Sequence, residues 1–173
     1  MDSSFHEAKW RDCYAQLAPK LLLYARQWVG SMTDAEDVVQ TAFVRFWRHQ
    51  PDAGSEHYPL LYAAVRSSAL DLLRAHDRRT RREADDRVGV VRGDEPWFDT
   101  HIEQREQAET MQAALSLLPT AQREVIVLKI WADLTFAQIA EALDESVNTV
   151  ASRYRYGLEA LRRHLEPTDY ERV

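Results

Sequence analysis

The sequence predicts an all-α protein of two small helical domains joined by a linker, the C-terminal domain containing a helix-turn-helix. Apolar residues recur at helical spacing through most of the chain, whereas the alternation that marks strands is rare. The chain has only 5 glycines, and its long segments are rich in Ala, Leu, Arg and Glu, which favour helices. A charged stretch with Gly89, Gly93 and Pro96 interrupts the periodicity and predicts the linker.

Two helices are expected at the N-terminus, over residues 5–17 and 19–29. Pro19 suits the first turn of the second helix, because its missing N–H would have no partner there, and Gly30 is the expected stop. The next helix, over residues 33–47, has the clearest apolar stripe in the chain. That stripe consists of Ala35, Val38, Val39, Ala42, Phe43, Phe46 and Trp47. Thr33 and Glu36 predict a capping box at its start.

A polar loop over residues 51–58 precedes a further helix, which begins at Pro59 and continues into five arginines between residues 74 and 82. Its expected core contacts are Leu61, Val65, Leu72 and Leu73. Residues 83–100 are expected to form a linker in which Trp97 and Phe98 dock locally. Helices over residues 101–118 and 122–131 follow, with Pro119 and Thr120 between them.

Two short capped helices end the chain. Thr135 and Gln138 predict a capping box for the first, and Ser146 is the expected N-cap of the second. The second helix carries Val147, Val150, Tyr154, Leu158 and Leu161 at helical spacing. A pair of this kind predicts a helix-turn-helix, whose second helix enters the major groove. Asp144 stands where the turn often has glycine, and aspartate tolerates the left-handed backbone better than most residues. An ordinary helical hairpin is the alternative that periodicity leaves open.

The distribution of charge favours DNA contacts within a larger assembly. A net charge of −6 is unusual for a protein that binds DNA alone. However, basic segments at residues 74–82 and 147–165 are separated by an acidic stretch at residues 93–109. Such a chain would touch DNA at two places and bind it weakly by itself, so a partner should supply the remaining affinity. A merely solvated helix end is the alternative for the arginine run.

Catalytic and cofactor signatures are missing from the sequence. The 6 histidines are scattered, and there is no metal-ligand spacing, phosphate loop or nucleophile elbow. We therefore expect no cofactor, no metal site and no enzymatic activity. The lone Cys13 excludes an internal disulfide, and neither a signal peptide nor a membrane-spanning run is visible. A cytoplasmic protein without direct membrane insertion is expected.

Three segments, in order, resemble the extracytoplasmic-function (ECF) sigma factors of bacterial RNA polymerase. Residues 34–47 (DAEDVVQTAFVRFW) are similar to the clamp-binding helix of their region 2. Residues 65–74 with the following arginines resemble the promoter-melting helix, and residues 118–165 resemble region 4. The resemblance covers nearly the whole chain and implies a region 2-like domain at 1–82, a linker at 83–106 and a region 4-like domain at 107–173.

The resemblance also implies partners and contact residues. Asp37, Gln40 and Thr41 would bind the clamp coiled coil of core RNA polymerase. The minus-ten element would be held by Arg66, Ser67, Asp71, Arg74, Arg78 and Arg79, with residues 52–57 as the loop that takes an extruded base. The minus-thirty-five element would meet Asn148, Ala151, Ser152, Arg153, Arg155 and Tyr156. Among these, Arg155 would read a guanine edge and Arg153 would contact a phosphate. An anti-sigma factor is a further implied partner.

The function predicted from these observations is that of an ECF sigma factor, which binds core RNA polymerase and directs it to promoters by reading both elements. One alternative is a stand-alone helix-turn-helix transcriptional regulator, which should bind its duplex tightly without polymerase. A second alternative is a helical interaction protein whose motif no longer binds DNA. Charge reversal at Arg153 and Arg155 would leave promoter output unchanged in that case.

Overall fold

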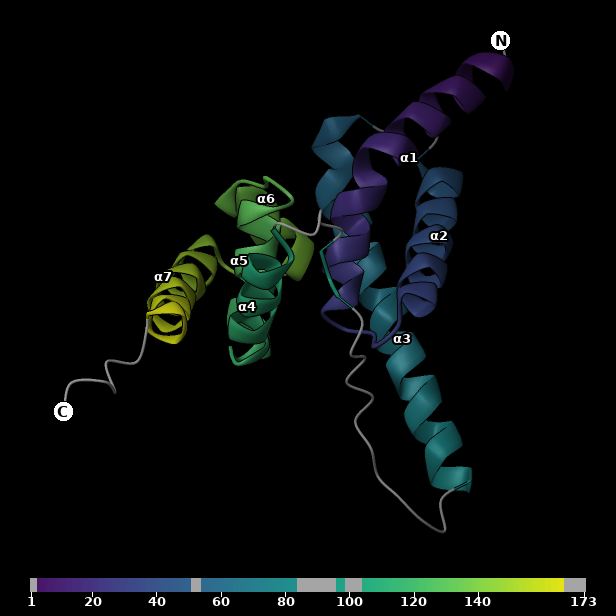
Figure 1. Cartoon of the computed structure of the whole chain (residues 1–173). Coiled ribbons are helices and arrows are strands. Elements are labelled where there is room, and N and C mark those ends of the chain that lie inside the picture. Colours follow the sequence, from purple (N-terminus) through teal and green to yellow (C-terminus); the bar gives the residue numbers. More distant parts are fainter. Residues whose placement is uncertain (1–2, 51–53, 84–95, 99–103, 167–173) are drawn as a thin grey trace, which may run out of the picture. The chain divides into compact units, whose positions relative to one another are not determined.

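The computed structural model describes residues 3–50, 54–83, 96–98 and 104–166, with side chains described from residue 9 and, in the third helix, to residue 79 (Figure 1). Within these residues the regular elements are seven α-helices and one short 3₁₀ helix, which confirms the all-α prediction. Contacts divide the chain into two compact units, Met1–Glu95 with Glu141–Asp144, and Pro96–Ala140 with Glu145–Val173. The linker bounds 83 and 106 stay predictions, because residues 84–95 and 99–103 lie outside the described residues.

The first unit contains α1 (Ser3–Arg26), α2 (Met32–His49), η1 (Ser55–His57) and α3 (Tyr58–Glu83). The helix α2 packs against both α1 and α3, and the apolar stripe predicted for it is its buried face. Phe43 in that stripe makes edge-on contacts with Trp10 and Tyr14 of α1, at ring-centroid distances of 5.6 and 4.9 Å. Because this face of α2 is used in packing, the opposite face remains exposed.

Three expectations for the first unit are wrong. The segment with Pro19 is one helix rather than two, because Leu17, Leu21 and Tyr24 on either side of the proline are buried and hold the helix across it. That helix ends at Arg26, before Gly30. The N-cap of α2 is Ser31, whose Oγ accepts a hydrogen bond from the Asp34 N–H at 3.0 Å, so Thr33 lies inside the first turn.

The helix α3 is buried only in its first half. Leu61 and Val65 are fully buried as predicted, whereas Leu72 is 36% exposed, contrary to prediction. The reason is geometric, since the second half of α3 extends beyond α1 and α2 (Figure 1). Arg74, Arg78 and Arg79 in this second half are exposed.

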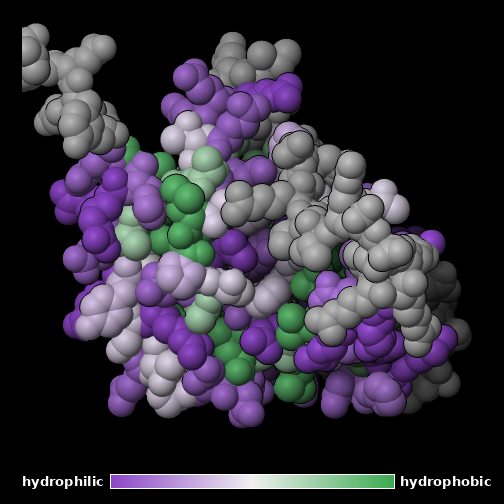
Figure 2. All heavy atoms as spheres, turned by 90° about the horizontal axis from the view of Figure 1, so that it is seen from below, coloured by the Kyte–Doolittle hydropathy of each residue, from purple (hydrophilic) through white to green (hydrophobic). Residues whose placement is uncertain are grey.

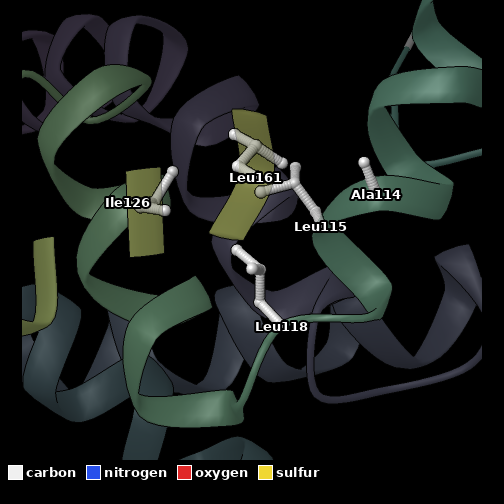
Figure 3. Close-up of a cluster of buried hydrophobic side chains, with 5 residues drawn as sticks. All are labelled: Ala114, Leu115, Leu118, Ile126 and Leu161. Atoms are coloured by element: carbon white, nitrogen blue, oxygen red, sulfur yellow. The ribbon is translucent and has the colours of Figure 1, made fainter. Parts of the chain in front are cut away.

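The second unit contains α4 (Arg105–Ser116), α5 (Thr120–Ile130), the part of α6 (Phe136–Leu143) that ends at Ala140, and α7 (Val147–Leu165). Its core brings α4, α5 and α7 together through Ala114, Leu115, Leu118, Ile126 and Leu161 (Figure 3). Trp97 and Phe98 pack against this cluster, and the Trp97 N–H donates to Gln112 Oε1 at 2.7 Å. The predicted local docking of these two aromatic residues is confirmed.

The view in Figure 2 is mostly hydrophilic, with hydrophobic groups in small separate areas among the described residues. Among the residues whose side chains are described, the large apolar ones left exposed are Leu60, Leu72, Leu117, Ile130, Val147, Tyr156, Leu158 and Leu165. In the described part of the chain, none of the helices has the length and apolar character needed to cross a membrane.

Candidate nucleic-acid and protein interfaces

The capping box predicted before α6 is present. Thr135 Oγ1 accepts from the Gln138 N–H at 3.2 Å, and Gln138 Oε1 accepts from the Thr135 N–H at 2.9 Å. Lys129 Nζ donates to the Leu134 carbonyl at 3.0 Å and lies 5.5 Å from the centre of the Phe136 ring. Together these bonds fix the point where the chain leaves α5 and enters α6.

The turn between α6 and α7 is a Schellman motif. Asp144 adopts a left-handed backbone, with φ of 53°. The Glu145 N–H donates to the Ala140 carbonyl at 3.0 Å, and the Asp144 N–H donates to the Glu141 carbonyl at 3.4 Å. This is the double bonding pattern that ends helices with a left-handed residue, usually glycine. The prediction that Asp144 would take this conformation is confirmed.

The helix α7 begins at the predicted cap. Ser146 Oγ accepts from the Thr149 N–H at 3.0 Å. Val150, Gly157 and Leu161 form its buried line, whereas Val147 and Leu158, which share the helical spacing, are 48% and 36% exposed. An α-helix advances about 100° per residue, so these two positions lie about 60–80° from the centre of the buried line.

Four of the predicted minus-thirty-five residues share the exposed face of α7: Asn148, Ser152, Arg155 and Tyr156. Ala151 is partly buried at the edge of that face. Arg155 lies over Tyr156, with its guanidinium 4.7 Å from the ring centre and donating to the hydroxyl at 3.0 Å. This pair presents a cation and an aromatic ring together, a combination suited to base edges and phosphates.

Arg153 is oriented differently. Its guanidinium donates to Glu145 Oε1 at 2.7 Å, and the two side chains are 29% and 33% exposed. Sequence reasoning missed Glu145 altogether. The sequence signal for this pair is a glutamate in the turn, eight residues before an arginine in the following helix.

The predicted minus-ten residues lie on α3. Ser67, Asp71, Arg74, Arg78 and Arg79 are exposed, and Arg74 forms an ion pair with Asp71 at 3.1 Å. An exposed pair of this kind contributes little to stability, so Arg74 can exchange its partner.

Other parts of the minus-ten prediction differ or are not described. Arg66 is partly buried, with its guanidinium 5.7 Å from the centre of the Trp28 ring. Of the predicted base-pocket loop, residues 52–53 lie outside the described residues, and Gly54 donates its N–H to His57 Nδ1 at 3.3 Å.

The predicted polymerase-binding residues Asp37, Gln40 and Thr41 are exposed on the face of α2 opposite its buried stripe. A shallow groove of about 280 Å³ runs between this face and α3. The groove is lined by Asp37, Val38, Thr41 and Arg45 from α2 and by Ser68, Asp71, Leu72 and Ala75 from α3. The predicted polymerase-binding face of α2 and the predicted minus-ten face of α3 therefore meet along this groove.

The remaining candidates for chemistry are clusters of metal-ligating side chains and the thiol of Cys13. Within the described residues there is no cluster of three His, Cys, Asp or Glu side chains that would hold a metal ion. Burial raises the pKa of the Cys13 thiol, an effect that outweighs its hydrogen bond with Tyr58. The thiol is therefore protonated near neutral pH and is a poor nucleophile.

Comparison with known proteins gives two family matches in the same order as the predicted domains. Residues 13–79 match the family model of Sigma-70 region 2, and residues 108–161 match that of Sigma-70, region 4. These two ranges contain α2, most of α3 and the helix-turn-helix, which are the elements that carry the candidate interfaces.

Curated relatives and solved structures agree with these matches. The chain is 31% identical to the ECF RNA polymerase sigma factor SigK of Mycolicibacterium vanbaalenii, covering 76% of this chain and 68% of that protein. It is 29% identical to SigL of Mycobacterium tuberculosis, covering 92% and 90%. The sigma factor RpoE of Bartonella quintana, solved with the anti-sigma factor NepR, aligns at a TM-score of 0.70 with 20% identity over 95% of this chain and 99% of that chain. CnrH, solved with the cytosolic domain of CnrY, aligns at 0.64 with 24% identity over 92% and 89%.

Proposed function

The chain belongs to the ECF sigma factors of RNA polymerase, and from this premise we propose which of its residues direct polymerase to promoters. An ECF sigma factor binds core RNA polymerase and selects promoters by reading the minus-thirty-five and minus-ten elements. The observation that best supports a residue-level assignment is the division of α7 into a buried line and an exposed polar face.

The exposed face of α7 reads the minus-thirty-five element. Asn148 and Ser152 lie in the N-terminal half of the helix, which is the half that a recognition helix inserts into the major groove. Arg155 extends from the same face and carries the geometry for a bidentate contact with guanine. Ala151 and Tyr156 complete this surface, with the methyl group and the ring suited to contacts with thymine methyls.

The exposed part of α3 holds the non-template strand of the minus-ten element. Arg74, Arg78 and Arg79 supply the positive charge that single-stranded DNA requires. Ser67 and Asp71 lie on the same helix and offer hydrogen-bonding groups for base edges. Arg66 contacts the strand from its position over Trp28, where the cation–π contact orients it.

The exposed face of α2 docks on the clamp coiled coil of core polymerase through Asp37, Gln40 and Thr41. These polar side chains stand on a helix whose other face is fixed in the core, so the surface is rigid before binding. The groove beside it makes part of α3 accessible to the same partner.

The net charge of −6 supports a function that depends on polymerase. Binding to duplex DNA draws much of its affinity from phosphate neutralisation, and an acidic chain gains less of it. A stand-alone regulator would need that affinity for itself, whereas a sigma factor shares the DNA surface of the polymerase. We further propose that the protein acts in the cytoplasm without catalysis of its own, and that an anti-sigma factor binds it and holds it inactive; the similar sigma factor RpoE was solved in complex with the anti-sigma factor NepR.

In vitro transcription with purified core polymerase on a promoter library tests this proposal. The expected result is that transcripts start at a small set of promoters sharing two elements, and only when the protein is added. A parallel gel-shift without core should show weak binding to the same promoters. Tight, sequence-specific binding without core, with no effect on transcription starts, would contradict the proposal and favour a stand-alone regulator.

A further inference from the structure

Arg153 has its ion-pair partner in the turn before the recognition helix, whereas Arg155 bonds its neighbour Tyr156 and Arg162 bonds Glu166 at the far end of the helix. The Arg153 guanidinium donates to Glu145 Oε1 at 2.7 Å, a short distance for such a bond. About a third of each side chain is exposed, so the pair is less screened by solvent than the exposed pairs of the same unit. The bond links residues on either side of the N-cap of α7.

The acidic end of this bond is held by the backbone. The Glu145 N–H is bonded to the Ala140 carbonyl, and Glu145 follows Asp144, the left-handed residue of the Schellman motif. The carboxylate therefore projects from a turn with little conformational freedom. Because Arg153 lies in the second turn of α7, the ion pair connects the end of α6 to the body of the recognition helix.

The basic end of the bond is turned away from the DNA-facing surface. At about 100° per residue, Arg153 lies about 100° around the helix from Ser152 and about 40° from the buried Gly157. To reach a phosphate, the guanidinium would have to leave Glu145. The unpaired carboxylate would then stand near the phosphate backbone and repel it.

We propose that Arg153 is a positioning residue of the recognition helix and does not contact a phosphate. Its ion pair with Glu145 sets the angle at which α7 presents Asn148, Ser152 and Arg155 to the minus-thirty-five element. The inference rests on the proposed reading of that element by α7. Under this proposal, Arg153 is not a DNA contact, although the family resemblance implies that it is one. Glu145 becomes a determinant of recognition although it does not itself contact DNA.

The substitution Glu145→Gln separates the two roles of Arg153. If the pair positions α7, this change should reduce the preference of the holoenzyme for a cognate over a scrambled minus-thirty-five element by about fivefold, and Arg153→Gln should do the same. The charge swap Glu145→Arg with Arg153→Glu should restore the preference to within about twofold of the native value. The preference is measured by competition binding of holoenzyme, reconstituted with core polymerase, to the two promoters.

A phosphate contact gives opposite results, which would overturn the inference. Glu145→Gln would then leave affinity unchanged or raise it, because a competing carboxylate is removed. Arg153→Gln would weaken cognate and scrambled promoters equally and lower the salt slope of binding by about 1, and the swap would not rescue binding. If Arg153 instead positions α7, the salt dependence of promoter binding by the Arg153→Gln holoenzyme should equal that of the native protein.

A matched control and two further measurements complete the test. Arg162→Gln removes an ion pair of similar length, 2.8 Å to Glu166, from the far end of the same helix, and the preference should not change. Thermal unfolding of each variant distinguishes repositioning from loss of fold, and Glu145→Gln carries the test if Arg153→Gln does not fold. Failure of the native protein to direct core polymerase to the cognate promoter would contradict the proposed function itself, a separate outcome.

Discussion

A Cβ atom on Gly157 would lie 2.8 Å from Cδ1 of Ile126, closer than side chains pack. It would also lie 3.2 Å from Cβ of Gln122. The missing side chain at residue 157 therefore lets α7 approach α5 directly over the buried Ile126. This contact connects α7 to α5, so it sets how firmly the face proposed to read DNA is held.

Substitution of Gly157 tests how tight this approach is. Gly157→Val should destabilise the second unit by about 2 kcal/mol, because the added isopropyl group has to displace α7 or Ile126. Gly157→Ala should be close to neutral, because alanine gains about 1 kcal/mol of helix propensity over glycine and this offsets the crowding. Hydrogen exchange of the α5 amides in the full chain measures both effects.

The partner change at Ile126 serves as the control. Ile126→Val alone should cost about 1 kcal/mol, because it removes the buried Cδ1 methyl and leaves a small cavity. Combined with Gly157→Ala, the loss should shrink, since the new Cβ fills that space. Additive effects of the two substitutions would contradict the close contact.

The left-handed Asp144 predicts a stabilising substitution. Asp144→Gly should raise the free energy of unfolding by about 0.5–1 kcal/mol, because glycine adopts a φ of 53° without a steric penalty. Asp144→Val should lower it by at least about 1 kcal/mol, since a β-branched residue is strained there. Urea unfolding of the full chain checks the order of the three proteins. A more stable valine variant would exclude a Schellman turn in solution.

Helix caps and turn conformations can be predicted from the sequence where they depend on neighbouring residues. The Thr135–Gln138 capping box, the Ser146 cap and the left-handed Asp144 each depend on a few consecutive residues and were predicted correctly. The prediction that a helix begins at Pro19 is wrong, because α1 continues through the proline when it is packed by residues distant in sequence. The Glu145–Arg153 pair was missed for a related reason, since periodicity does not determine how a turn orients a side chain toward the next helix.

The polymerase-docking proposal predicts a selective defect for Asp37→Lys. Asp37 is exposed on α2, so reversing its charge should leave the fold intact and abolish promoter-specific run-off transcription with core polymerase. The circular dichroism spectrum and thermal midpoint should match the native protein. Glu106→Lys makes the same charge change on an exposed side chain of α4 and should transcribe normally. Normal transcription by Asp37→Lys would remove this residue from the docking surface.

Arg155 predicts a change in promoter choice rather than in promoter strength. Its guanidinium is held over the Tyr156 ring on the exposed face of α7. Arg155→Ala should weaken binding of the holoenzyme to elements with guanine at one position by about 1–3 kcal/mol, and transcription from those elements should fall accordingly. Elements that lack this guanine should be unaffected. Transcription from a library of minus-thirty-five sequences measures this. Arg163→Ala removes the same charge from the exposed last turn of α7 and should leave the ranking of the library unchanged. A uniform loss across the library for Arg155→Ala would instead make Arg155 a phosphate contact, because phosphates carry no sequence information.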